Sequence, residues 1–223
     1  MKLLLVAATQ AEISPLLEHL KAHCQSIDSN IFMHGDNTVT TCITGVGMVA
    51  TTYAVTKALQ TEHYTLVLQA GVGGSFSTDI PLGTVVRVTD ERYGDLGAED
   101  HDAYIDIFEM GLLPKDEHPY TNGKLTATET DGFDTLTAVS GITVNTVSGN
   151  ANTIAARVGR YASIVESMEG AAFHYVCLKE HVPFAQVRAI SNYVEPRNRA
   201  AWKMKDAIIN LNNWLIDFLT RAQ

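Results

Sequence analysis

The chain has 223 residues, 46% of them hydrophobic and 18% charged, which is enough for one well-buried α/β domain. Its 16 Lys and Arg against 25 Asp and Glu give a formal net charge of −9, and an acidic surface argues against nucleic acids and anionic membranes as partners. No apolar run approaches the length of a membrane-spanning helix. We therefore expect a single domain over residues 1–223, located in the cytoplasm.

The first half of the chain alternates apolar, β-branched runs with segments of helical periodicity. The predicted elements are a strand at Lys2–Ala8, a helix at Ala11–His23 with Pro15 in its first turn, a strand at Thr38–Thr44, a helix at Met48–Thr61 and a strand at Leu66–Ala70. A glycine-rich loop, Gly71–Gly74, is expected to follow that last strand. Thr84–Thr89 is the next predicted strand.

The second half begins with a polar, aperiodic segment, Gly94–Gly132, of the kind that is often functional in a compact domain. The predicted elements that follow are strands at Gly141–Val147, Ser163–Glu166 and Phe184–Ser191, a helix at Glu169–Glu180, and a C-terminal helix with an apolar stripe made of Met204, Ile208, Leu211, Leu215, Phe218 and Leu219. This alternation predicts a three-layer α/β domain with a central, twisted, mixed and mainly parallel β-sheet flanked by helices.

Polar residues follow several of the predicted strands, where ligands gather in open α/β sheets. Glu12, Glu169 and Asn192 lie just beyond three strand ends, and Gly71–Gly73 lie beyond a fourth. Each signal also has a plain structural explanation. Carboxylates are favoured in a first helical turn, Asn closes turns, and glycines permit tight backbone conformations.

The cysteines and acidic clusters give no sign of a metal centre. Cys24, Cys42 and Cys177 are an odd number without a CxxC pair, and they are expected to be free, buried thiols in a reducing compartment. The carboxylates and the histidine within residues 99–106 are expected to form a solvated loop. We therefore predict neither a metal nor a cofactor.

Five segments taken together resemble the nucleoside phosphorylase/nucleosidase superfamily in order and spacing over nearly the whole chain. They are Lys2–Glu12, Gly45–Ala50, Ala70–Gly74, Val165–Gly170 and Val187–Asn192. The likeness is close to the methylthioadenosine/S-adenosylhomocysteine nucleosidase branch. Leu96–Asp100 and Ile190–Arg197 further resemble segments of the futalosine hydrolases, enzymes of the alternative menaquinone pathway. The resemblance implies a nucleoside phosphorylase-like fold and a homodimer or higher homo-oligomer.

The resemblance also implies roles for individual positions in binding a small purine nucleoside. Glu12 matches the carboxylate that activates the attacking water, and Met168 with Glu169 matches the ribose-binding pair. Gly71, Val72 and Gly73 line the sugar and base, with Val46 and Ser191 also in the substrate pocket. Asn152 and Thr153 fall where the family's backbone and an aromatic ring meet the purine. Asn152 departs from that aromatic residue, which leaves base stacking there in doubt.

Asn192 stands where adenine-specific nucleosidases carry an aspartate. Its amide can donate to a 6-oxo group and accept from a protonated N7, which suits hypoxanthine better than adenine. The resulting interpretation is hydrolysis of futalosine to hypoxanthine and dehypoxanthine futalosine, with Arg197 as the candidate partner for the substrate's benzoate. Glu12 in the first strand's loop, without a nearby Lys or Arg, favours water over phosphate. An adenine-releasing nucleosidase and a binding protein without turnover are the alternatives.

Overall fold

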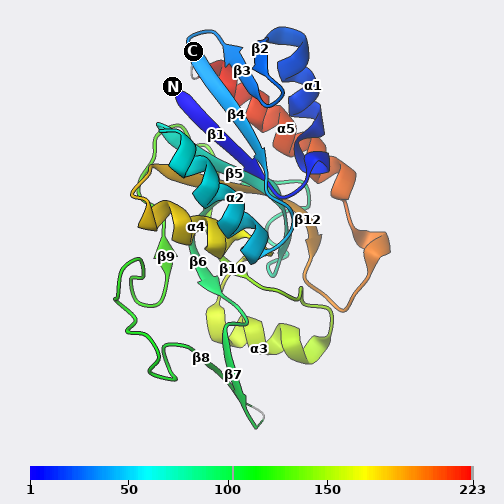
Figure 1. Cartoon of the computed structure of the whole chain (residues 1–223). Coiled ribbons are helices and arrows are strands. Elements are labelled where there is room, and N and C mark those ends of the chain that lie inside the picture. The colour runs from blue at the N-terminus through cyan, green and yellow to red at the C-terminus, as the bar shows by residue number, and fades with distance from the viewer. Residues whose placement is uncertain (102, 222–223) are drawn as a thin grey trace.

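The centre of the molecule is a mixed β-sheet with helices on both of its faces (Figure 1). The structure is a computed structural model that describes residues 1–101 and 103–221. Within them, the strand order of the main sheet is β11-β10-β6-β12-β5-β1-β4-β3-β2. In chain order these strands are β1 (Lys2–Ala7), β2 (Gln25–Asp28), β3 (Ile31–His34), β4 (Asn37–Ile43), β5 (Leu66–Ser75), β6 (Val85–Tyr93), β10 (Thr137–Thr143), β11 (Val165–Ser167) and β12 (Phe184–Tyr193).

The sheet closes on itself at one end. β11 pairs in parallel with β10 and antiparallel with β5, so β5, β12, β6, β10 and β11 form a closed ring of strands. A short strand, β9 (Leu125–Thr126), adds to the edge of β6. The predicted mixed, mainly parallel sheet is confirmed, because β1–β4, β1–β5, β5–β12, β6–β10 and β10–β11 are all parallel pairs.

The two faces of the sheet are covered by different helix pairs, as alternation along β1 requires. Leu3 and Leu5 point into a core shared with α1 (Ser14–His23) and α5 (Met204–Arg221). Leu4 and Val6 point the other way, into a core shared with α2 (Met48–Thr61) and α4 (Gly170–Lys179). A strand buried on both faces therefore shows an unbroken apolar run in the sequence.

The helices follow their sequence signals closely. α2 has the predicted bounds, and α1 carries Pro15 in its first turn as expected. A 3-10 turn, η1 (Gln10–Ile13), precedes α1 and replaces the first turn of the predicted helix. On α5, the buried positions include four residues of the predicted stripe, Leu211, Leu215, Phe218 and Leu219. The other two residues of the stripe, Met204 and Ile208, are only half-buried.

The glycine-rich loop predicted at Gly71–Gly74 is wrong, because these residues belong to β5. β5 and β12 continue side by side to Ser75 and Tyr193. The ladder needs only backbone N–H and C=O groups, which glycines supply, so low β-propensity did not end the strand. The strand predicted at Gly141–Val147 is also shifted, since β10 ends at Thr143.

Several elements that the sequence analysis did not predict bury little of their surface. All four residues of β2 are exposed, and no residue of α3 (Ala151–Tyr161) is buried. The segment 94–132, which was expected to be polar and aperiodic, contains β9 and a hairpin of β7 (Gly97–Asp100) and β8 (Ala103–Asp106). The hairpin stands where the acidic residues within 99–106 were expected to form a solvated loop, and Asp102 lies outside the described residues. A second 3-10 turn, η2 (Arg199–Ala201), precedes α5.

The three cysteines are free thiols in the structure, as expected. Only Cys177 is fully buried, and burial raises the pKa of its thiol well above the usual range. Cys24 and Cys42 are half-buried, so the prediction that all three are buried is wrong. Among residues 1–101 and 103–221, no group of His, Cys, Asp and Glu side chains is arranged to hold a metal. None of the helices described here is long and apolar enough to cross a membrane.

Candidate active site

Glu12 lies in η1, just after β1, and its side chain reaches over to β5. Its Oε1 accepts the backbone N–H of Val72 at 3.1 Å, and its Oε2 accepts the N–H of Thr9 at 2.9 Å and lies 3.0 Å from the Thr9 hydroxyl. These contacts fix the carboxylate toward the carboxyl ends of β1 and β5. Glu12 is 8% exposed. The position matches the strand-end rule that singled out Glu12 in the sequence.

Glu169 caps the start of α4, immediately after β11 and Met168. Its Oε1 accepts the backbone N–H of Gly47 at 3.1 Å, and its Oε2 lies 3.4 Å from Nη1 of Arg188. Gly47 has a φ of 94°, a conformation that glycine adopts without strain. The turn before α2 therefore delivers a backbone donor to a carboxylate that comes from a distant part of the chain.

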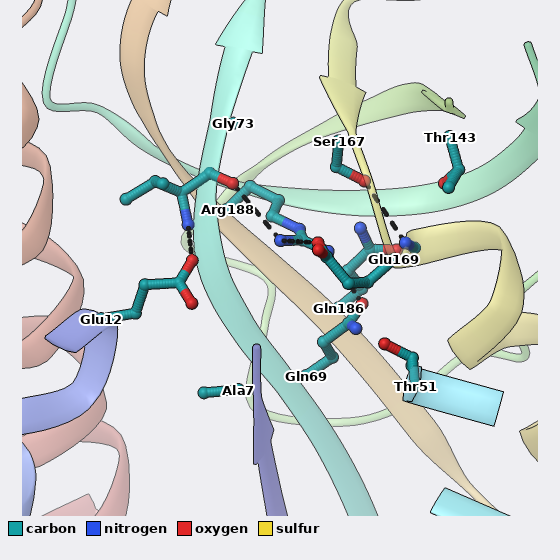
Figure 2. Close-up of polar contacts among 12 residues, drawn as sticks. Ala7, Glu12, Thr51, Gln69, Gly73, Thr143, Ser167, Glu169, Gln186 and Arg188 are labelled. Carbon is teal, nitrogen blue, oxygen red and sulfur yellow. Dashed lines mark hydrogen bonds and ion pairs between the residues drawn. The ribbon is translucent and has the colours of Figure 1, made fainter. Parts of the chain in front are cut away.

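Arg188 lies between the two carboxylates, beside Gly71 (Figure 2). Its Nη1 also donates to the carbonyl of Val72 at 3.3 Å, and its Nη2 donates to Oε1 of Gln69 at 3.1 Å. A Cβ on Gly71 would lie 2.7 Å from Arg188 Nη1 and 2.8 Å from Oε1 of Glu12. Gly71 is thus needed because two functional side chains occupy the space where its own side chain would be.

The three charged groups leave a formal net charge of −1 when both carboxylates are ionised. Arg188 is only 1% exposed, and in the described part of the chain it is the one cation in contact with Glu12 or Glu169 as an ion pair. A dry site with net negative charge stabilises positive charge on a bound molecule. This arrangement suits a reaction that passes through an oxocarbenium-like sugar.

Asn192 lies near the end of β12, beside this charged centre but outside it. Its Oδ1 accepts from the Ser191 hydroxyl at 2.9 Å, and its Nδ2 donates to the carbonyl of Tyr193 at 3.0 Å. These two bonds orient the amide and leave one Nδ2 hydrogen for another acceptor. Asn192 also lines a hollow of about 60 Å³, which Arg197 borders as well.

The remaining residues predicted for the site lie in β5, beside Glu169, in the turn before α2 and in α3. Gly73 and Val72 are in β5 beside Arg188, and Met168 is half-buried next to Glu169. Val46 is 57% exposed at the turn that presents Gly47. Asn152 and Thr153 lie in the first turn of α3, where the Thr153 N–H already donates to Oδ1 of Asn150. Roles for these side chains in binding stay predictions.

The sequence interpretation missed Arg188, Gln69 and Glu91. The signal was present, since Gln69 and Arg188 interrupt the apolar runs of β5 and β12, and buried charged residues are rare unless they are paired. Glu91 on β6 is fully buried and accepts from Nε2 of Gln186 and from the Thr143 hydroxyl, both at 3.0 Å. Burial raises the pKa of Glu91 to about 7.

His174 on α4 adds to this second polar layer beneath the site. Its Nδ1 lies 2.9 Å from the carbonyl of Leu125. Burial lowers the pKa of His174 to about 4. A contact with the Gln186 side chain acts against burial and raises the pKa of His174 in part. The layer thus holds two titratable groups, Glu91 and His174, in neutral-favouring surroundings.

Comparison with known proteins identifies the family to which this fold and site correspond. The family model described as Phosphorylase superfamily matches residues 2–219. The chain belongs to the phosphorylase superfamily. Two relatives are futalosine hydrolases. That of Streptomyces coelicolor is 32% identical over 70% of this chain and 66% of its own, and that of Thermus thermophilus is 30% identical over 74% of each.

Solved structures of superfamily members share the fold. A futalosine hydrolase of Helicobacter pylori matches with a TM-score of 0.80 at 16% identity, covering 100% of this chain and 98% of that one. A 5′-methylthioadenosine/S-adenosylhomocysteine nucleosidase of the same species, in complex with an aminopyrrolopyrimidine ligand, matches with a TM-score of 0.80 at 16% identity, covering 99% and 98%. The predicted nucleoside phosphorylase-like fold is therefore confirmed.

Proposed function

We propose that this protein hydrolyses the N-glycosidic bond of a purine nucleoside, and that its substrate is futalosine. The observation that carries the proposal is the placement of Glu12 and Glu169 on either side of Arg188 at the carboxyl ends of β1, β5 and β11. The futalosine hydrolases among its relatives support the substrate. The products are then hypoxanthine and dehypoxanthine futalosine, a step of menaquinone biosynthesis.

The mechanism requires positive charge on the sugar while water attacks the anomeric carbon. Glu12 takes the proton of that water as it attacks from the face opposite the base. Glu169 binds the sugar hydroxyls and, with Arg188 holding it in place at 3.4 Å, keeps a carboxylate close to the developing charge. One-step displacement of the base by water gives inversion at the anomeric carbon.

Asn192 is the group proposed to receive the departing base. The Ser191 hydroxyl holds its Oδ1, so that the free Nδ2 hydrogen can donate to the 6-oxo group of hypoxanthine. A 6-amino group would present a donor to this donor, and the mismatch in a dry pocket costs about 1–3 kcal/mol. The amide therefore favours futalosine over an adenine nucleoside such as methylthioadenosine.

Water rather than phosphate is proposed as the attacking group. Phosphorolysis needs cationic or N–H donors that are free to bind phosphate. The Val72 N–H donates to Glu12. Arg188 donates to Glu169, Gln69 and the Val72 carbonyl and is 1% exposed, so it is not open to a phosphate. A carboxylate at the position of Glu12 would also repel a phosphate dianion.

The binding of the substrate's far end is a further part of the proposal. Arg197, exposed over the ring of Trp202, is proposed to meet the benzoate carboxylate of futalosine. An Arg197→Ala variant is expected to raise KM for futalosine about tenfold or more with little change in kcat, because a lost charge-assisted bond weakens binding. An unchanged KM, in steady-state assays, would remove Arg197 from this role.

A cytoplasmic homodimer or higher homo-oligomer is proposed as the working form. The surface of α2 supports it, because Val49 is 84% exposed and Tyr53 is 69% exposed. Large exposed apolar side chains that gather on one helix mark interaction surfaces.

A substrate panel tests the proposed function. The protein is incubated with futalosine, inosine and methylthioadenosine, with and without inorganic phosphate, and the free base is followed by chromatography. Hypoxanthine from futalosine in the absence of phosphate is expected. Adenine from methylthioadenosine as the main product would replace the substrate, a requirement for phosphate would replace hydrolysis, and no release at all would indicate a binding protein.

A further inference from the structure

A second buried carboxylate, Glu166, borders the same hollow as Asn192. Glu166 is on β11, and Asn192 is on β12, with β5 between them. Glu166 is 4% exposed. The mechanism above gives it no part, although a buried carboxylate at the wall of a cavity is a candidate for ligand recognition.

The sheet register places the two side chains on one face. Glu166 pairs with Gly74 from the β11 side, and Asn192 pairs with Gly74 from the β12 side. Cross-strand partners point to the same face of a sheet. A Cβ on Gly74 would lie 2.9 Å from Cγ2 of Val194 and 3.2 Å from Nδ2 of Asn192, whereas one on Gly73 would meet Val165 instead. Gly74 therefore allows the Asn192 side chain to lie close over β5, on the face that Glu166 shares.

The spacing of these groups fits a flat heterocycle. Two residues that flank the same central strand have Cα atoms roughly 9–10 Å apart, twice the spacing between strands. Both side chains line the hollow from these positions, so a planar ring that enters it can meet both polar ends. The hollow has a volume of about 60 Å³ and one of its walls, at Val147 and Ser148, leads into α3, a helix without buried residues. A loosely packed wall can move outward as a base enters.

Three hydrogen bonds hold the Glu166 carboxylate in place. Its Oε1 accepts the Ser148 N–H at 2.8 Å, and its Oε2 accepts the Ser148 hydroxyl at 2.7 Å and Nη1 of Arg157 at 2.8 Å. A carboxylate offers about four acceptor positions, so one position on Oε1 remains. The Glu166 carboxylate is therefore held in place and paired with a cation, and it can still accept one more N–H.

We propose that Glu166 accepts the N1–H of a 6-oxopurine whose O6 and N7 edge meets Asn192. The inference rests on the proposed function and deepens it. Hypoxanthine carries a hydrogen on N1, whereas adenine carries a lone pair there, which a carboxylate repels. Asn192 and Glu166 thus form hydrogen bonds on opposite sides of the C6 carbonyl of the purine, and each disfavours adenine through a different atom. The Arg157 ion pair and Ser148 position the carboxylate for that contact.

The test compares Glu166→Gln with Asp95→Asn. Asp95 lies 3.9 Å from Arg157 Nη2 and does not line the hollow, so its variant controls for loss of an Arg157 partner. Dissociation constants for free hypoxanthine and free adenine are measured by calorimetry on folded protein. Glu166→Gln is expected to lower the preference for hypoxanthine about 10- to 100-fold, because a glutamine can also donate to N1 of adenine. Asp95→Asn should keep the wild-type preference.

The outcomes separate this inference from the proposed function. A wild-type protein that prefers adenine would contradict the proposed function itself. A wild-type preference for hypoxanthine that survives in Glu166→Gln would overturn the role of Glu166 alone. If Glu166→Gln does not fold, wild-type binding of 1-methylhypoxanthine, which lacks the N1–H, decides the matter. Affinity equal to that for hypoxanthine would overturn the proposal, and a loss of about tenfold or more would support it.

Discussion

Glu12 and Arg188 meet at Gly71, and their contacts assign different tasks to the two side chains. Among the described residues, Glu12 accepts hydrogen bonds from Val72 and Thr9 alone, and we expect one face of its carboxylate to be available for water. Arg188 donates to three protein partners through Nη1 and Nη2, while its buried Nε has no partner among the described residues. We propose that it acts by holding Glu169. At this scale the two carboxylates differ in the kind of partner: backbone N–H groups and a hydroxyl hold Glu12, whereas Glu169 is paired with a cation.

Replacing Glu12 by Gln should abolish proton removal from water while keeping the shape of the side chain. We expect kcat to fall about 100- to 10,000-fold, the usual contribution of a general base, with the fold intact. Base release is measured by chromatography, and stability by urea unfolding. Glu18→Gln on the exposed side of α1 is the matched control and should leave kcat unchanged. Full activity in Glu12→Gln would rule out its role.

Arg188 tests whether the guanidinium is needed for its geometry or only for its charge. Arg188→Met leaves the buried Glu169 without its ion pair and should lower the free energy of unfolding by about 3–5 kcal/mol. Arg188→Lys keeps the charge but cannot reach Gln69, Glu169 and the Val72 carbonyl together, so kcat/KM should still fall. Urea unfolding and steady-state kinetics measure both effects. A fully active Arg188→Lys would mean that charge alone suffices.

At the scale of elements, α5 reaches across the chain to hold η1. Asn212 is a buried residue on the otherwise apolar face of α5. Its Nδ2 donates to the carbonyl of Glu12 at 2.8 Å, and its Oδ1 accepts the N–H of Leu16 at 3.0 Å. The amide thus joins the end of η1 to the start of α1. The C-terminal helix fixes the backbone that carries Glu12, the carboxylate proposed to activate water.

Asn212→Ala should therefore affect both stability and catalysis. Losing two buried hydrogen bonds is expected to cost about 1–3 kcal/mol of unfolding free energy and to lower kcat through misplacement of Glu12. Asn213→Ala, one residue along the same helix and exposed, should change stability by less than about 0.5 kcal/mol. Thermal unfolding and kcat are measured for both. Loss of stability in Asn212→Ala without any loss of kcat would limit Asn212 to a structural role.

At the scale of the whole molecule, the buried layer of Glu91 and His174 sets how stability responds to pH. Glu91 has its pKa raised from 4.5 to about 7 by burial, so its contribution is full below pH 4.5 and is lost as pH rises through 7. His174 has its pKa lowered from 6.5 to about 4 by burial, so its contribution is full above pH 6.5 and is lost as pH falls through 4. The two opposite slopes cancel between about pH 4.5 and 6.5.

Single variants should expose each slope. Relative to the wild type, Glu91→Gln is expected to gain about 3 kcal/mol of unfolding free energy as pH rises from 4.5 to 7.5, because one pKa unit corresponds to about 1.4 kcal/mol. His174→Gln should gain stability relative to the wild type as pH falls from 6.5 to 4. Urea unfolding at closely spaced pH values measures both. Parallel curves for wild type and Glu91→Gln would show that Glu91 does not titrate in this range.

The sequence by itself determined the layers and the order of most strands and helices. Period-2 and period-3.6 patterns record which faces are buried, so β1, α2 and α5 could be predicted from the chain alone. The strand-end rule then brought Glu12, Glu169 and Asn192 to one rim, because parallel strands share an edge. The superfamily resemblance, now confirmed by the match to residues 2–219, gave those positions their expected chemistry.

Tertiary structure alone decided what lies between those residues. The continuation of β5 through its glycines, the closure of the sheet by β11, and the contact of Arg188 with Glu169 all depend on strand register. The pairings of β5 with β11 and β12 join residues about 90 to 118 positions apart in the chain, and no local periodicity encodes them. The side-by-side placement of Asn192 and Glu166 across Gly74 belongs to the same class of fact, because it exists only once three strands have paired.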